Sequence, residues 1–163
     1  MSKLVAISLA AAFAGGLTVS ASAQLVTHKD LTTGMAMTMA ETAIQTCKQQ
    51  GYNVSAHVVG RTGQVLVAMR GDNTGPHTLE NSMKKAYTAK AQRRPSGEFA
   101  TAVKDNFTAG ALRLSNIVPA QGALPIKVGE DTIGAIGVSG APGGDKDEAC
   151  AKAGIEKVAA ELK

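Results

Sequence analysis

The sequence is poor in aromatic residues: its 163 residues include no Trp, three Phe and two Tyr. A hydrophobic core must therefore be built mainly from aliphatic side chains. Only one long apolar run is present, Leu4 to Leu17, and three small residues interrupt it. No other segment is long and apolar enough to cross a bilayer, so we expect no membrane insertion by the rest of the chain.

The first residues contain the three parts of a secretory signal peptide. Lys3 supplies a positive charge, the apolar run follows, and Ala21-Ser22-Ala23 precedes Gln24 as a small-residue cleavage site. We predict that residues 1–23 are removed, leaving residues 24–163 as one domain that is periplasmic or secreted. The alternative is a retained N-terminal anchor, although a full span needs about 20 apolar residues.

The chain has only a small excess of positive charge. Its 17 Lys and Arg against 13 Asp and Glu give +4, and removal of Lys3 leaves 16 against 13, or +3. This excess weakly favours acidic ligands and is too small to indicate nucleic acid, a partner that export also argues against.

Only two cysteines are present, Cys47 and Cys150, one near each end of the mature chain. An even number of cysteines in an oxidising compartment predicts a disulfide between them. Two buried free thiols are the alternative.

The hydrophobic periodicity predicts the element order α-β-β-α-α-β-β-α. Two pairs of β-rich segments are each joined by a short turn containing glycine, which is typical of hairpins and of a mostly antiparallel sheet. The fold class is therefore α/β of the α+β type, with helices packed on the sheet. The predicted elements are a helix capped by Thr32 or Thr33 and ended at Gly51, strands 52–59 and 64–70, a helix from Thr78 that stops before Pro95, a helix from Ser96, strands 123–128 and 132–138, and a helix over about 146–162.

Two finer features of the helices are also predicted. The helix from Thr78 has Leu79, Met83, Ala86 and Tyr87 on one apolar face. The segment from Asp145 to Glu148 matches a capping box at the start of the last helix.

Familiar catalytic motifs are absent. Gly134, Gly137 and Gly140 lack the G-x-G-x-x-G spacing of dinucleotide sites and more simply mark a close backbone approach. Ser139 stands in a stretch like a nucleophile elbow, but all three histidines precede it. The cysteines are far apart and no two histidines are four residues apart, so a zinc site has no support. A binding protein is therefore favoured over an enzyme.

Three stretches together resemble one known family: Gly75-Pro76-His77-Thr78 followed by Lys85-Ala86-Tyr87-Thr88-Ala89; Leu124-Pro125-Ile126; and Ile133 to Ala141 leading to Asp145 and Ala149. They resemble the HbpS/GlcG family of haem-binding-like proteins, which also appears as the C-terminal domain of PduO. The resemblance covers roughly residues 31–162. It implies a profilin-like sandwich, homo-oligomers and, in some members, haem bound through a histidine.

Two positions depart from that family's usual pattern. Gly60 stands where the family usually carries Asp, and Gly122-Ala123 stands where it usually has Gly-Gly. The roles of those positions elsewhere do not transfer to this chain.

His77 is the strongest candidate for a haem ligand. It lies in a Gly/Pro loop just before a predicted helix, with Lys84 and Lys85 on the following turns as cations for propionates, and Tyr87 and Met83 as possible walls of an apolar slot. The alternatives are a solvated loop histidine and a solvated basic helix face.

The other histidines and one acidic segment are weaker candidates. His28 ranks second, because an N-terminal arm could reach a haem on a neighbouring subunit. His57 lies in the middle of a strand and is expected to be a hydrogen-bonded or exposed residue. Asp145 to Glu148 also fits the D/E-x-x-E iron motif described in some relatives, although capping explains the same residues.

The sequence thus predicts an exported, homo-oligomeric protein that binds haem or another tetrapyrrole, or a different small anionic ligand, for storage, scavenging or sensing. One alternative is a haem-degrading or small-molecule enzyme of the same family. The other is a non-catalytic partner of a membrane sensor.

Overall fold

The computed structural model describes residues 24–106 and 109–163, so the predicted signal peptide, residues 1–23, lies outside the described residues. The predicted element order is confirmed, with two short 3₁₀ turns in addition. The elements are α1 (Thr33–Gln49), β1 (Ser55–Val59), β2 (Val65–Arg70), α2 (Thr78–Gln92), α3 (Ser96–Val103), η1 (Gly110–Arg113), β3 (Ala123–Val128), β4 (Asp131–Ser139), α4 (Gly144–Lys157) and η2 (Ala159–Glu161).

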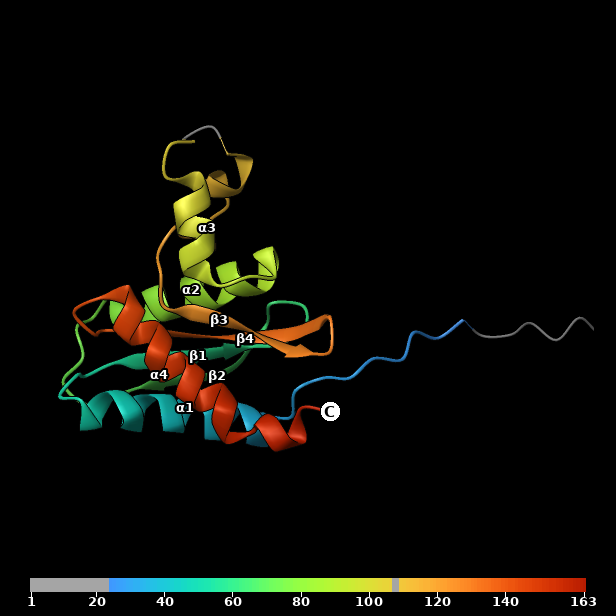
Figure 1. Cartoon of the computed structure of the whole chain (residues 1–163), viewed down its shortest axis with the longest axis horizontal. Coiled ribbons are helices and arrows are strands. Elements are labelled where there is room, and N and C mark those ends of the chain that lie inside the picture. Colours follow the sequence, from blue (N-terminus) through green and yellow to red (C-terminus); the bar gives the residue numbers. More distant parts are fainter. Residues whose placement is uncertain (1–23, 107–108) are drawn as a thin grey trace, which may run out of the picture.

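The four strands form one antiparallel sheet in the order β2-β1-β4-β3. Helices α1 and α4 pack on one face and α2 on the other, with α3 projecting beyond α2 (Figure 1). Ser55 pairs with both Arg70 and Ser139, so the start of β1 and the ends of β2 and β4 lie at the same end of the sheet. The loops that enter α2 and α4 leave from that end.

The face under α1 and α4 carries the larger core. Thr32 caps α1 by accepting a hydrogen bond from the Met35 amide, and Gly51, with φ of +83°, follows the helix end, as expected. Met39 and Ile136 are fully buried in this core. Cys47 and Cys150 form the predicted disulfide, with Cα atoms 5.7 Å apart, so α1 and α4 are joined side by side.

The predicted apolar face of α2 is only partly the buried face. Ala86 is fully buried, as part of that face, whereas Leu79, Met83 and Tyr87 are only half-buried. The residues against the sheet are mostly small or polar: Thr78, Ser82, Lys85, Ala86, Thr88 and Ala89. The physical reason is the close approach of α2 to β4. A Cβ atom at Gly137 would lie 2.3 Å from the Ser82 carbonyl oxygen, so larger side chains would hold the helix away.

The start of α4 also differs from the prediction. The helix begins at Gly144 with Gly143 as N-cap and no side-chain cap, so the capping box at Asp145 and Glu148 was wrong.

Strand β1 starts at Ser55, three residues later than predicted. Ser55 pairs with Ser139, the last residue of β4, so residues before Ser55 have no partner in that strand. Over the described part of the chain, no helix has the length and apolar character needed to cross a bilayer.

Candidate functional site

The imidazole of His77 is exposed at the start of α2. His77 is the N-cap residue of this helix, and its side chain makes no capping bond. Within residues 24–106 and 109–163 the ring has no hydrogen-bond partner. A nitrogen of this ring can therefore coordinate a metal without breaking an existing bond.

Polar bonds, most of them partly buried, fix the backbone on both sides of His77. Arg70 donates from Nε to Thr74 Oγ1 (3.0 Å) and from Nη2 to the Thr74 carbonyl oxygen (2.9 Å). Thr78 Oγ1 donates to the carbonyl oxygen three residues earlier (2.9 Å) and lies 2.8 Å from Ser55 Oγ. The backbone that carries the imidazole is therefore held both before and after His77.

Two surface hollows meet at His77, each of about 390 Å³. The first, here named the α2–α4 hollow, lies between α2 and the loop that enters α4. The second, the end hollow, lies between residues 51–53 and the loop that carries His77. Pro142 lines both hollows, and Tyr52 lines the end hollow. His77 thus stands on the ridge between a polar and a partly apolar depression.

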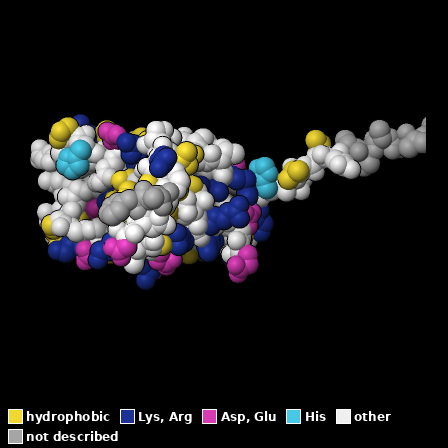
Figure 2. Space-filling model, turned by 90° about the horizontal axis from the view of Figure 1, so that it is seen from above, with side chains coloured by type: hydrophobic (Ala, Val, Ile, Leu, Met, Phe, Trp, Pro, Cys, Tyr) yellow, Lys and Arg dark blue, Asp and Glu magenta, His cyan; other side chains and the backbone are white. Residues whose placement is uncertain are grey.

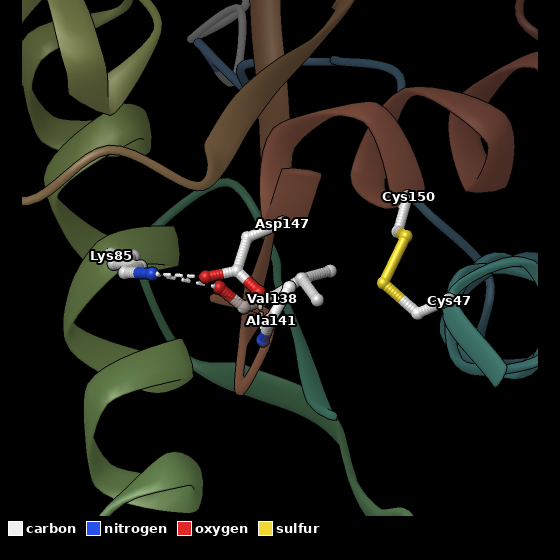
Figure 3. The surroundings of a disulfide bond; sticks show 6 residues. All are labelled: Cys47, Lys85, Val138, Ala141, Asp147 and Cys150. Carbon is white, nitrogen blue, oxygen red and sulfur yellow. Dashed lines mark hydrogen bonds and ion pairs between the residues drawn. A yellow bond between two sulfur atoms is a disulfide. The ribbon is translucent and has the colours of Figure 1, made fainter. Parts of the chain in front are cut away.

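A buried ion pair lies in the wall of the α2–α4 hollow (Figure 3). Lys85 Nζ donates to Asp147 Oδ2 (2.8 Å) and to the Val138 carbonyl oxygen (3.1 Å), and Asp147 Oδ1 accepts from the Ala141 amide (3.0 Å). Burial raises the pKa of the Asp147 carboxyl, while Lys85 and the Ala141 amide oppose this shift. Gly122 is required beside the pair, because a Cβ there would lie 2.7 Å from Lys85 Nζ.

Further polar side chains line the same hollow, among them Asn81, Gln121 and Ser139. Asn81 Nδ2 donates to Ser139 Oγ at 3.0 Å, which links α2 to the end of β4. The α2–α4 hollow is therefore a polar site and does not provide the apolar slot that a porphyrin ring needs.

Of the other residues predicted near His77, only Lys85 shares a hollow with it. Lys85 is buried and paired with Asp147, so it does not lie on the solvated basic helix face that was the alternative to a propionate-binding role. Lys84 pairs with Glu80 at 2.6 Å. Met83 and Tyr87 line neither hollow, and Tyr87 instead packs over Gly63 and beside α3.

His28 and His77 lie at opposite ends of the sheet. Arg61 donates to the Lys29 carbonyl oxygen and pairs with Asp131 at 2.8 Å, which holds the N-terminal segment beside the two hairpin turns. Figure 2 accordingly shows exposed histidine side chains at opposite ends of one face. The two residues do not form one site within a single chain.

His57 is a hydrogen-bonded strand histidine, one of the two outcomes expected for it. Its Nδ1 lies 2.8 Å from Ser82 Oγ, and Ser82 donates its own proton to the Leu79 carbonyl oxygen, so Nδ1 is the donor to Ser82. Burial lowers the pKa of His57. This residue holds α2 on the sheet and does not face the hollows at His77.

The acidic segment at the start of α4 does not form a metal site. Asp145 is exposed, Asp147 is paired with Lys85, and Glu148 is half-buried with its Oε2 unpaired. Burial raises the pKa of Glu148, and Glu98 and Asp145 add to this effect. In the described ranges, no three His, Cys, Asp or Glu residues come together as potential metal ligands.

Sequence reasoning missed the residues around His77 that lie far away in the chain. Asp147 had been assigned to a capping box, and Tyr52 and Pro142 had no role. Their positions depend on how the loops pack at the end of the sheet, and no local motif shows this packing.

Two solved structures share the fold of this chain. Its fold matches the crystal structure of HbpS with a TM-score of 0.78 and 33% identity, covering 84% of this chain and 96% of that one. It also matches a structure titled PduOC:Heme Complex, with a TM-score of 0.71, 21% identity and coverage of 77% and 93%; this likeness shows the shared fold alone.

A curated relative matches over a shorter stretch. An uncharacterised 15.0 kDa protein of Citrobacter freundii is 36% identical over 86 residues, 51% of this chain and 61% of that protein. The match thus spans less than two thirds of that relative. The family model described as "Haem degrading protein HbpS-like" matches residues 31–156, most of the chain. The chain therefore belongs to the HbpS-like family.

Proposed function

We propose that this protein binds haem or a related iron tetrapyrrole, with His77 as an axial ligand to the iron. The observation that carries the proposal is the exposed imidazole, which makes no hydrogen bond to any described residue, on a fixed loop between two hollows. Haem bound here would supply an iron centre able to bind small ligands or exchange electrons.

The lining of the end hollow supplies two of the three features that haem needs. Haem needs an axial nitrogen, an apolar surface for the ring and donors for its propionates. His77 supplies the nitrogen, and Tyr52 and Pro142 supply part of the apolar surface. The family description names haem, and a relative of the same fold is named as a haem complex, which supports the choice of ligand.

Titration of hemin into the mature protein tests the proposal. We expect a shifted and saturable Soret band for the wild type and for His28→Ala, and loss or marked change of that band for His77→Ala. The His28 variant is the matched control, because it removes an exposed imidazole from the other end of the sheet. An unchanged His77→Ala spectrum would refute the assignment.

A second candidate function is haem degradation, which the family description names. Incubating the haem complex with ascorbate and oxygen, or with peroxide, separates the two functions. Steady loss of the Soret band with formation of a linear tetrapyrrole would support degradation, and a stable band would support binding alone.

We also propose that the chain is exported and assembles into homo-oligomers. The apolar N-terminal run and the Ala21-Ser22-Ala23 ending support export, and the formed disulfide is compatible with an oxidising compartment. The mass of the protein recovered from a periplasmic fraction would show whether it starts at Gln24, and light scattering after gel filtration would give the number of subunits.

A further inference from the structure

A third hollow continues the site away from His77. This α1–β2 hollow has a volume of about 340 Å³ and lies between α1, the end of β2 and residues 71–72. It shares Tyr52 and Asn53 with the end hollow, so the two depressions adjoin. A flat ligand held at His77 can therefore extend past Tyr52 into the α1–β2 hollow.

The floor of this hollow is apolar, unlike that of the α2–α4 hollow. Ile44, Val54 and Met69 line it from α1, the start of β1 and β2. Ile44 and Val54 belong to the main core, and Met69 packs on that core. The hollow thus offers hydrophobic contact that the polar wall formed by Lys85 and Asp147 lacks.

Cationic side chains stand at the rim of the same hollow. Arg70 is held by Thr74 through Nε and Nη2, and this leaves Nη1 without a partner among the described residues. Lys48 makes only a long, exposed contact with Asp72, 3.8 Å, which contributes little energy.

Two carboxylates, Glu41 and Asp72, line the rim as well, so its formal charges are balanced. All of these groups are exposed, but Arg70 is held by its bonds to Thr74, and its guanidinium can pair with a carboxylate in a defined geometry. An apolar floor bordered by the fixed guanidinium of Arg70 and the exposed amine of Lys48 is suited to a flat hydrophobic molecule that ends in carboxylates.

We infer that the α1–β2 hollow receives the carboxylate-bearing edge of the tetrapyrrole, with Arg70 and Lys48 binding its propionates. This inference rests on the proposed function, because it takes His77 as the iron ligand. In this arrangement Arg70 has two roles: it fixes the loop that carries His77, and it binds the ligand. Lys48 only binds the ligand.

The test compares hemin with hemin dimethyl ester, in which both propionates are esterified and uncharged. We expect Lys48→Met to weaken hemin binding by up to about 5-fold, as for loss of one exposed ion pair, and to leave ester binding unchanged. Arg70→Gln should weaken hemin more than the ester. Lys127→Met, on the exposed side of β3, is the matched control and should bind both as the wild type does.

The outcomes separate this inference from the proposed function. If His77→Ala abolishes the Soret shift while Lys48→Met and Arg70→Gln bind hemin like the wild type, the haem site stands and the propionate assignment is wrong. Equal weakening of hemin and ester by both variants would also overturn it, since the residues would then act only through the loop. An unchanged His77→Ala spectrum would instead overturn the proposed function.

Discussion

Lys85 and Asp147 form an ion pair between α2 and α4 whose side chains are only 5% and 3% exposed. The pair joins two helices on opposite faces of the sheet, and the Ala141 amide ties it to the loop that enters α4. Because this loop also lines both hollows at His77, the pair supports the shape of the candidate site.

Removing one member of this pair should be strongly destabilising. Asp147→Asn or Lys85→Met leaves a buried polar or charged partner without compensation, so we expect a loss of about 3–5 kcal/mol in the free energy of unfolding. The double variant Lys85→Met, Asp147→Asn should lose less than the sum of the single losses. Urea unfolding of the four proteins measures this coupling, and additive losses would argue against a direct interaction.

The disulfide between Cys47 and Cys150 should contribute a large part of the stability. It closes a loop with a sequence separation of 103 residues, for which the chain-entropy model gives about 4–5 kcal/mol. We expect the double variant Cys47→Ser, Cys150→Ser to unfold at markedly lower urea concentration. Reduction of the wild type should reproduce the effect, and equal midpoints with and without reductant would contradict it.

The approach of α2 to β4 requires a glycine at position 137. A Cβ there would lie 2.3 Å from the Ser82 carbonyl oxygen and 2.6 Å from the Ala86 amide nitrogen, both backbone atoms. Gly137→Ala should therefore cost about 1–3 kcal/mol through overpacking. Gly110→Ala, where a Cβ has no neighbour within 4 Å, is the control. Equal thermal stability of the two variants would disprove the close contact.

Burial of His57 should make the stability depend on pH. Because burial lowers the pKa of the folded-state imidazole, its stabilising contribution is fully present above the unfolded-state pKa near 6.5 and is lost as the pH falls through the lower folded-state pKa. His57→Gln should flatten the decline in unfolding free energy between pH 7.5 and pH 5. His28→Gln, which changes an exposed residue, should keep the wild-type slope.

The element order could be predicted from the sequence because its signals are local. Thr32 and Gly51 bound α1, and each hairpin has a short turn between two β-rich segments. The disulfide was also predictable, since only two cysteines are present. Such signals need no knowledge of which elements pack together.

The packing of α2 could not be predicted in the same way. Apolar periodicity assigned Met83 and Tyr87 to its buried face, whereas the structure buries Ser82 and Lys85. The close contact with Gly137 admits only small groups in the centre, and Asp147 compensates the buried charge of Lys85. Both causes lie more than 50 residues away in the chain.

The candidate site was predictable only at its centre. His77 stood out because a Gly/Pro loop precedes a helix there, and the structure leaves its ring exposed. Tyr52, Arg70 and Lys48 carry no motif. Tyr52 lines the end hollow, and Arg70 and Lys48 line the adjoining α1–β2 hollow.

The most direct test of the account is chemical rescue of the iron ligand. In His77→Gly the imidazole is replaced by space at the same loop position, so hemin should bind weakly and give an altered Soret band, and added free imidazole should restore the wild-type band. His28→Gly should show the wild-type spectrum with or without imidazole. A His77→Gly protein whose haem spectrum already equals that of the wild type would contradict the account.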